Sequence, residues 1–161
     1  MKVVVNATPL IGLALIDRLD LLPALFDEVV VPRAVYEEVV VQGRVGAAAL
    51  SNADWVQLRE PNSSPTIEPL LLGLDAGELQ VLLLARDLQP DWVLVDERLG
   101  RRVAHVLQLP VKGTVGVLLA AFRASLLTKT EALEAIQQLH AQGFRMSAAV
   151  VSWFEQELEQ A

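Results

Sequence analysis

The stretch KVVVNATPL, residues 2–10, sets the pattern on which the fold depends. The β-branched valines at positions 3–5, together with Lys2, predict a buried strand over residues 2–5 that ends at Asn6. Thr8 and Pro9 then have the residue types preferred at a helix N-cap and at the first helical position. The segment therefore predicts a strand that passes almost directly into a helix.

The same alternation of strand and helix continues along the chain. Further strands are expected at residues 28–31, 55–58, 92–95 and 111–112, and helices at residues 10–16, 21–26, 33–50, 75–88, 98–107, 115–124, 128–142 and 147–157. Residues 59–69, rich in Pro, Ser, Asn and Thr, are expected to form a loop. Strands that alternate with helices imply the α/β class: a three-layer α/β/α domain with a mostly parallel sheet of four to five strands.

The chain of 161 residues has the length of one compact domain. No linker rich in Pro, Gly or Ser divides it, so residues 1–161 are expected to form a single domain. Residues 128–160 would then be C-terminal helices on that same domain. Apolar residues make up 53% of the chain, which is more than a core of this size requires. The surplus favours an oligomer or a surface that binds a partner.

Composition excludes several classes of function. The chain has no cysteine, so it can form neither a disulfide nor a thiolate metal site. Its net charge of −7 argues against simple electrostatic binding of nucleic acid, so such binding would need a local basic patch or bound cations. No apolar run approaches the ~20 residues needed to span a bilayer. We expect a cytoplasmic protein without a membrane segment.

Polar side chains follow the predicted strands at the edge where parallel α/β sheets bind ligands. They comprise Asn6 and Thr8 after the first strand, Glu37 and Glu38 after the second, Asp75 and Glu78 at a later helix start, and Asp96 and Glu97 after the fourth strand. Clustered carboxylates repel one another unless a cation offsets their charge. Hard oxygen ligands suit Mg²⁺ or Mn²⁺, which polarise a phosphoryl oxygen and acidify a bound water.

Each of these residues also has a purely structural interpretation. Asp75 and Glu78 have the spacing of a helix capping box. One of the two glutamates at positions 37 and 38 is expected on a solvated helix surface. Asp96, at the end of an apolar strand, needs a partner, which could be a nearby arginine instead of a metal.

Five segments together resemble the PIN-domain family, in particular its small, single-domain, VapC-like toxin nucleases. In order they are VVNATPLI (4–11), VVPRAVYEEV (30–39), LDAGE (74–78), LVDERLGRRVA (94–104) and KGTVGVL (112–118). The resemblance covers roughly residues 1–145 and lies in the order and spacing of the segments. It implies a Mg²⁺- or Mn²⁺-dependent endoribonuclease that pairs with a small antitoxin protein and forms homodimers or larger homo-oligomers.

The resemblance also assigns roles to residues. The family's acidic positions fall on Asn6, Glu38, Glu78 and Asp96, with Asp75 and Glu97 as further or substitute metal ligands. Thr8 corresponds to a hydroxyl that such proteins place beside the first acid.

The chain departs from the family at Asn6, where Asp is usual. An amide oxygen can bind a metal but brings no charge, which removes ~4 kcal/mol of attraction at ~4 Å and an effective dielectric near 20. The alternative is therefore a catalytically silent PIN-like module that binds RNA or a partner protein. A third possibility is a nucleotide-binding regulatory domain that uses Gly113 and Thr114.

Three arginines follow the fourth strand and share a helix face in pairs. Arg98, Arg101 and Arg102 could hold RNA phosphates next to the metal, or could form a solvated face with ion pairs. His105 and His140 have no partner at ligand spacing and are interpreted as ordinary helix residues. The apolar side of residues 150–158 could pack in the core or form a groove for a dimer or an antitoxin.

Overall fold

The computed structural model describes residues 1–62 and 72–161. Its central element is a five-stranded sheet in the order β3-β2-β1-β4-β5, in which every neighbouring pair is parallel. The strands are β1 (Lys2–Val5), β2 (Glu28–Pro32), β3 (Val56–Arg59), β4 (Trp92–Leu94) and β5 (Val111–Lys112). The expected α/β class and parallel sheet are confirmed.

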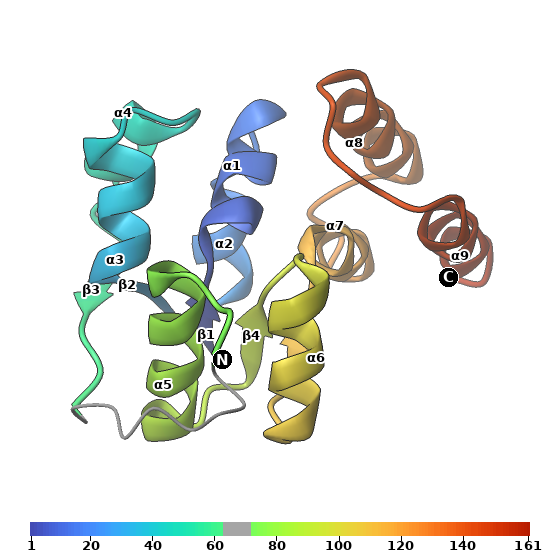
Figure 1. Ribbon diagram of the computed structural model, residues 1–161. Helices are drawn as coiled ribbons and strands as arrows, with labels where there is room; N and C mark the ends of the chain where they lie inside the picture. Colours follow the sequence, from blue (N-terminus) through green and yellow to red (C-terminus); the bar gives the residue numbers. More distant parts are fainter. Residues whose placement is uncertain (63–71) are drawn as a thin grey trace.

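Helices cover both faces of the sheet (Figure 1). On one face, α3 (Arg33–Tyr36) and α5 (Ala76–Leu88) pack on each other and on β2. On the other, α1 (Ala7–Leu15) and α2 (Leu21–Leu25) pack with α7 (Thr114–Arg123). The central valines of β1 and β2 are fully buried because each strand has a helix layer on both sides.

Two C-terminal helices extend the α7 side of the molecule, α8 (Lys129–Ala141) and α9 (Ala148–Glu159). Both contact α7 and each other, and Figure 1 shows them beyond α7, away from the sheet. Phe154 and Leu158 of α9 are buried within the hydrophobic core cluster. None of the helices in the described ranges has the length and apolar character needed to cross a bilayer.

The prediction of one continuous helix over residues 33–50 is wrong. The chain instead forms α3, a π-helical turn η1 (Glu37–Val41), a reversal, and the short helix α4 (Ala47–Ser51). Gly43 and Gly46 in the reversal have φ of +69° and +90°, a backbone conformation that glycine adopts at little cost and that ends a helix. The wider π turn carries Glu37 and Glu38, and such turns are frequent at functional sites.

The start of α1 differs from the expected cap at Thr8. Asn6 is the N-cap residue and the helix begins at Ala7, although the Asn6 side chain caps nothing. Pro9 still fits because its missing N–H lies within the first turn, where no intrahelical partner exists. The Thr8 side chain therefore lies inside the first turn and is available for a long-range contact.

Other predicted helix ends are confirmed. Asp75 caps α5 in a capping box with Glu78, and Thr128 caps α8 in the same way. Ser147 caps α9, and α6 (Arg98–Val106) follows β4 as expected. Residues 63–69 of the expected loop lie outside the described part of the chain.

Candidate functional site

The direction of chain travel across the sheet reverses between β1 and β4. The chain runs from β1 through β2 to β3, returns to β4 on the other side of β1, and continues to β5. Val5 is in register with Leu94, and the backbone N–H of Asn6 donates to the Leu94 carbonyl at 3.0 Å. In open parallel sheets ligands bind at such a switch point, beyond the carboxyl ends of the strands.

At this point Asn6 and Thr8 hold the side chain of Glu97. Asn6 is only 3% exposed, and its Nδ2 donates to Glu97 Oε2 at 3.2 Å. Thr8 Oγ1 donates to the other oxygen, Oε1. Both carboxylate oxygens of Glu97 are thus fixed by residues at the start of α1, so Glu97 belongs to the site and not to the solvated surface.

A second group of acids lies where η1 meets the start of α5. Asp75 Oδ1 accepts from the Glu78 N–H at 2.8 Å, and the Asp75 N–H donates to Glu78 Oε2 at 3.0 Å. A Cβ atom added at Gly77 would lie 3.3 Å from Glu38 Oε2 and 3.4 Å from Asp75 Oδ1. The absence of a side chain at Gly77 therefore lets Glu38 and Asp75 approach the same point.

Two of these acids, Glu38 and Glu78, have a raised pKa, in part because other acids lie nearby. Burial raises the pKa of Glu78, which is 9% exposed, and the charges of Asp75, Glu97 and Glu38 raise it further. Burial also raises the pKa of Glu38, and Asp75 and Glu97 add to it. Arg44 opposes this shift through a 3.7 Å contact with Glu38, but both side chains are partly exposed, so the pair is weak. We call Glu38, Asp75, Glu78 and Glu97 the acidic cluster.

Asp96 faces a different neighbour. Its Oδ1 accepts from the Thr114 N–H at 2.9 Å and its Oδ2 from Thr114 Oγ1 at 2.7 Å. Burial raises the pKa of Asp96, while these bonds and the charge of Arg101 counteract the shift. Gly113 makes room for this arrangement, because a Cβ there would lie 2.7 Å from Asp96 Oδ1. Each carboxylate oxygen still has a lone pair that Thr114 does not use.

The donor chemistry suits a hard divalent cation. Carboxylates and an amide oxygen are the ligands that Mg²⁺ and Mn²⁺ prefer, and a cation would offset the repulsion within the acidic cluster. However, across residues 1–62 and 72–161 no three acidic or histidine side chains surround a common point at metal-binding geometry. The residues fit a metal in type, and side-chain rotation would have to bring them together.

The three arginines of α6 differ in environment. Arg101 is partly buried and donates from Nη1 to the Val95 carbonyl at 3.0 Å, whereas Arg98 and Arg102 are exposed. Thr114 and Arg44 contact the site, although sequence reasoning gave neither of them this role. A threonine directly after a glycine at a helix start was the available signal for Thr114, but its buried bond to Asp96 required the fold.

The fold and the acids at its switch point define an α/β domain with the architecture of a nuclease. The model of the PIN-domain family matches residues 2–160, and the chain therefore belongs to the PIN-domain family. No similar curated protein and no similar solved structure was found.

Proposed function

We propose that this chain is a metal-dependent endoribonuclease of the VapC-like toxin type, acting as a single domain over residues 1–161. The observation that carries the proposal is the acidic cluster. Four carboxylates from three separate segments lie close together at the edge of the sheet where ligands bind, and the charges of Asp75 and Glu97 help to raise the pKa of Glu38 and of Glu78. Retaining such repulsion without a compensating cation costs stability, so the cluster is best explained as a cation site.

Glu38, Glu78 and Asp96 would hold Mg²⁺ or Mn²⁺, with Asp75 and Glu97 as neighbouring or substitute ligands. When bound, the ion polarises the phosphodiester and lowers the pKa of a water. Asn6 uses its N–H group on Glu97, which leaves its amide oxygen as a neutral ligand. Thr8 fixes Glu97 and would orient water or phosphate from the same position. Arg98, Arg101 and Arg102 would bind RNA phosphates beside the ion.

We also propose that the chain forms homo-oligomers and pairs with a small antitoxin protein in the cytoplasm. Several large apolar side chains are exposed in the described ranges, among them Val41 of η1, the turn that also carries Glu38, and Val45 in the reversal after it. Such residues suit a protein interface better than a free surface.

The test is cleavage of a fluorogenic single-stranded RNA by the purified chain in Mn²⁺ and in EDTA. Cleavage is expected in Mn²⁺ and should disappear in EDTA and in Glu38→Gln. Glu37→Gln is the matched control, since Glu37 is the exposed neighbour on the same π turn. Absence of cleavage in Mn²⁺, both as the chain stands and after Asn6→Asp, would overturn the proposal.

A catalytically silent PIN-like module remains the second candidate, and Asn6 is the observation that favours it. A neutral residue stands at the position where the family usually has an acid, and its amide already donates to Glu97. This candidate predicts RNA binding without cleavage, and Asn6→Asp would then restore activity.

The nucleotide-binding alternative is disfavoured by the contact between Thr114 and Asp96. The Thr114 N–H, which would bind a phosphate, already donates to a carboxylate. The negative charge at that position would repel a phosphate group.

A further inference from the structure

The chain's cations fall into two groups. Of the thirteen lysines and arginines, six form ion pairs with carboxylates: Lys2, Arg18, Arg33, Arg44, Arg123 and Lys129. Six others form no ion pair with any carboxylate in residues 1–62 or 72–161, namely Arg59, Arg98, Arg101, Arg102, Lys112 and Arg145. Five of these six line one groove, and Arg59 lies outside it on β3.

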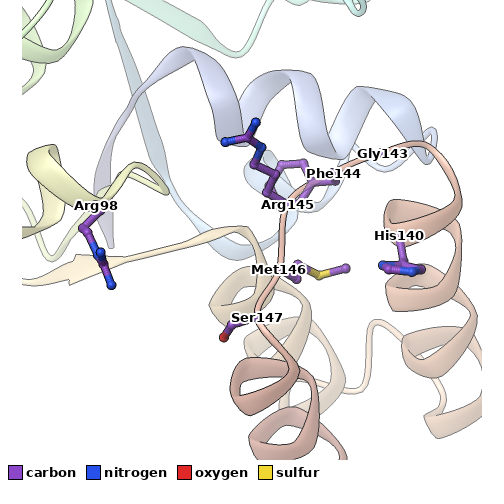
Figure 2. Close-up of a pocket in the computed structure, with 7 residues that line it drawn as sticks. All are labelled: Arg98, His140, Gly143, Phe144, Arg145, Met146 and Ser147. Atoms are coloured by element: carbon purple, nitrogen blue, oxygen red, sulfur yellow. The ribbon is translucent and has the colours of Figure 1, made fainter.

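The groove has a volume of about 980 Å³ and lies between α6, the β5–α7 junction and α9. Five cations line it against a single carboxylate, Asp96, although the whole chain carries a net charge of −7. An adjoining hollow shares Arg98 and the segment that precedes α9. Figure 2 shows Arg98 on one side of this hollow and residues 143–147 on the other. We call the larger cavity the α6–α9 groove.

One wall of the α6–α9 groove is apolar and aromatic. Trp153 of α9 is 44% exposed, and Val106 and Val150 beside the groove are also exposed. In the described ranges the only paired aromatic rings are Phe26 and Trp92, so no ring covers Trp153. An exposed indole beside arginines that form no ion pair suits stacking on a nucleobase, and a base can stack there only if it is not already paired within a duplex.

We propose that the α6–α9 groove binds a single-stranded segment of RNA and leads it to Asp96. Arg98, Arg102, Lys112 and Arg145 bind successive phosphates, and Trp153 stacks on one base. The inference rests on the proposed function for its substrate, and it adds a binding surface outside the acidic cluster. The groove is continuous with the proposed cleavage site, because Asp96 lies in its wall. This continuity favours the substrate over an acidic partner protein as the occupant.

Fluorescence anisotropy of a labelled oligouridylate, measured in EDTA, tests binding without cleavage. Arg145→Ala and Trp153→Ala should each weaken binding about tenfold, and Trp153→Phe, which keeps a ring, should weaken it less. Loss of one phosphate contact should also reduce the slope of log affinity against log salt by roughly 0.7. Arg59→Ala is the matched control, because Arg59 is exposed on the far edge strand β3 and outside the groove. It should leave both affinity and slope almost unchanged.

Three results would each overturn the inference. The first is an equal affinity for RNA of Arg145→Ala, Arg102→Ala and the unmodified chain, and the second is equal binding of duplex and single-stranded RNA. The third is displacement of bound RNA by polyglutamate as effectively as by polyuridylate. Circular dichroism would show that Trp153→Ala is folded, and the exposed arginine variants test the groove independently of that helix. Groove-dependent binding without cleavage would support the groove while refuting the nuclease proposal. Cleavage with an unchanged KM in Arg145→Ala would support the nuclease proposal and refute the groove.

Discussion

The amide of Asn6 donates a 3.2 Å hydrogen bond from Nδ2 to Oε2 of Glu97, which lies 91 residues further along the chain. Asn6 is buried at the end of β1, and Thr8 binds the other oxygen of Glu97. The asparagine therefore supplies something that an aspartate could not, a donor to a neighbouring carboxylate. Asparagine at this position therefore provides a hydrogen bond within the site, and it lacks the negative charge with which an aspartate would attract a metal ion.

Asn6→Asp should make stability depend on metal. In EDTA the variant should unfold about 1–3 kcal/mol more easily, because a buried donor is lost and a second carboxylate faces Glu97. In saturating Mn²⁺ the deficit should shrink or reverse, since the added charge gains ~4 kcal/mol of attraction at an effective dielectric near 20. Urea unfolding with and without Mn²⁺ measures both values.

Asn52→Asp is the control for this substitution. Asn52 is exposed after α4, so the same change of charge there should leave the effect of Mn²⁺ on unfolding unaltered. If both variants responded to Mn²⁺ alike, the ion would not be bound at position 6.

The fold was accessible from the sequence where local signals determine it. Buried β-branched runs gave the strands, and the spacing of Asp75 and Glu78 gave a capped helix start. The interrupted helix after β2 was missed because hydrophobic periodicity continues through residues 33–50. Its break depends on positive φ at two glycines, Gly43 and Gly46, whose spacing was the only local sign.

The candidate site was accessible as a set of positions but not as a set of contacts. Strand ends predicted which acids reach one edge of the sheet. Whether Asp96 faces Thr114 or the acidic cluster depends on side-chain rotamers and on the approach of β5, which no spacing rule specifies. Arg145 and Trp153 join the α6–α9 groove from the C-terminal segments, so only the packed structure places them beside α6.

Asp75→Ala should destabilise the protein by about 1 kcal/mol, the usual cost of losing an N-cap side chain. Asp75→Asn should retain most of the stability, because an amide oxygen can still accept from the Glu78 N–H. Thermal unfolding of both variants tests this difference. Thr128→Ala removes the equivalent cap from α8 and should cost a similar amount while leaving RNA cleavage and Mn²⁺ binding unchanged. If Thr128→Ala reduced RNA cleavage more than Asp75→Ala did, the placement of Asp75 in the cleavage site would be contradicted.

Glu78 should make the protein less stable as pH rises. Its pKa in the folded state is raised above the ordinary value of 4.5, mainly by burial, so folding favours the protonated form. The stabilisation from that proton is complete below pH 4.5 and is lost as pH rises through the raised pKa. Glu78→Gln does not titrate and keeps an oxygen for the Asp75 N–H, so its stability relative to the unmodified chain should increase with pH.

Urea midpoints across the acid-to-neutral range measure this trend in metal-free buffer. Glu134→Gln, which removes an exposed carboxylate on α8, is the matched control. Added Mn²⁺ should then stabilise the unmodified chain more than Glu78→Gln at neutral pH. A difference in unfolding free energy between Glu78→Gln and the unmodified chain that stayed constant at every pH would show that the pKa of Glu78 is not raised in the folded state.

Thr114→Val should separate the bond to Asp96 from the packing at the start of α7. Thr114 is fully buried and the two side chains have nearly the same shape, so the main loss is the 2.7 Å bond from Oγ1 to Asp96. A hydrogen bond to a charged group is worth about 1.5–3 kcal/mol, whereas Thr114→Ser keeps the hydroxyl and should cost about 1 kcal/mol for the lost methyl group.

The deficit of Thr114→Val should also depend on pH. Burial already raises the pKa of Asp96, and the Thr114 hydroxyl partly counteracts this shift, so its removal raises the pKa further. The variant should therefore lose more stability at neutral pH than below 3.8, where Asp96 is protonated even when unfolded. Urea unfolding of both variants at acid and neutral pH measures this difference, and Thr114→Ser should show little of it. Equal deficits for Val and Ser at neutral pH would mean that Thr114 contributes packing alone, leaving the Asp96 carboxylate to be positioned by its backbone contact and Arg101.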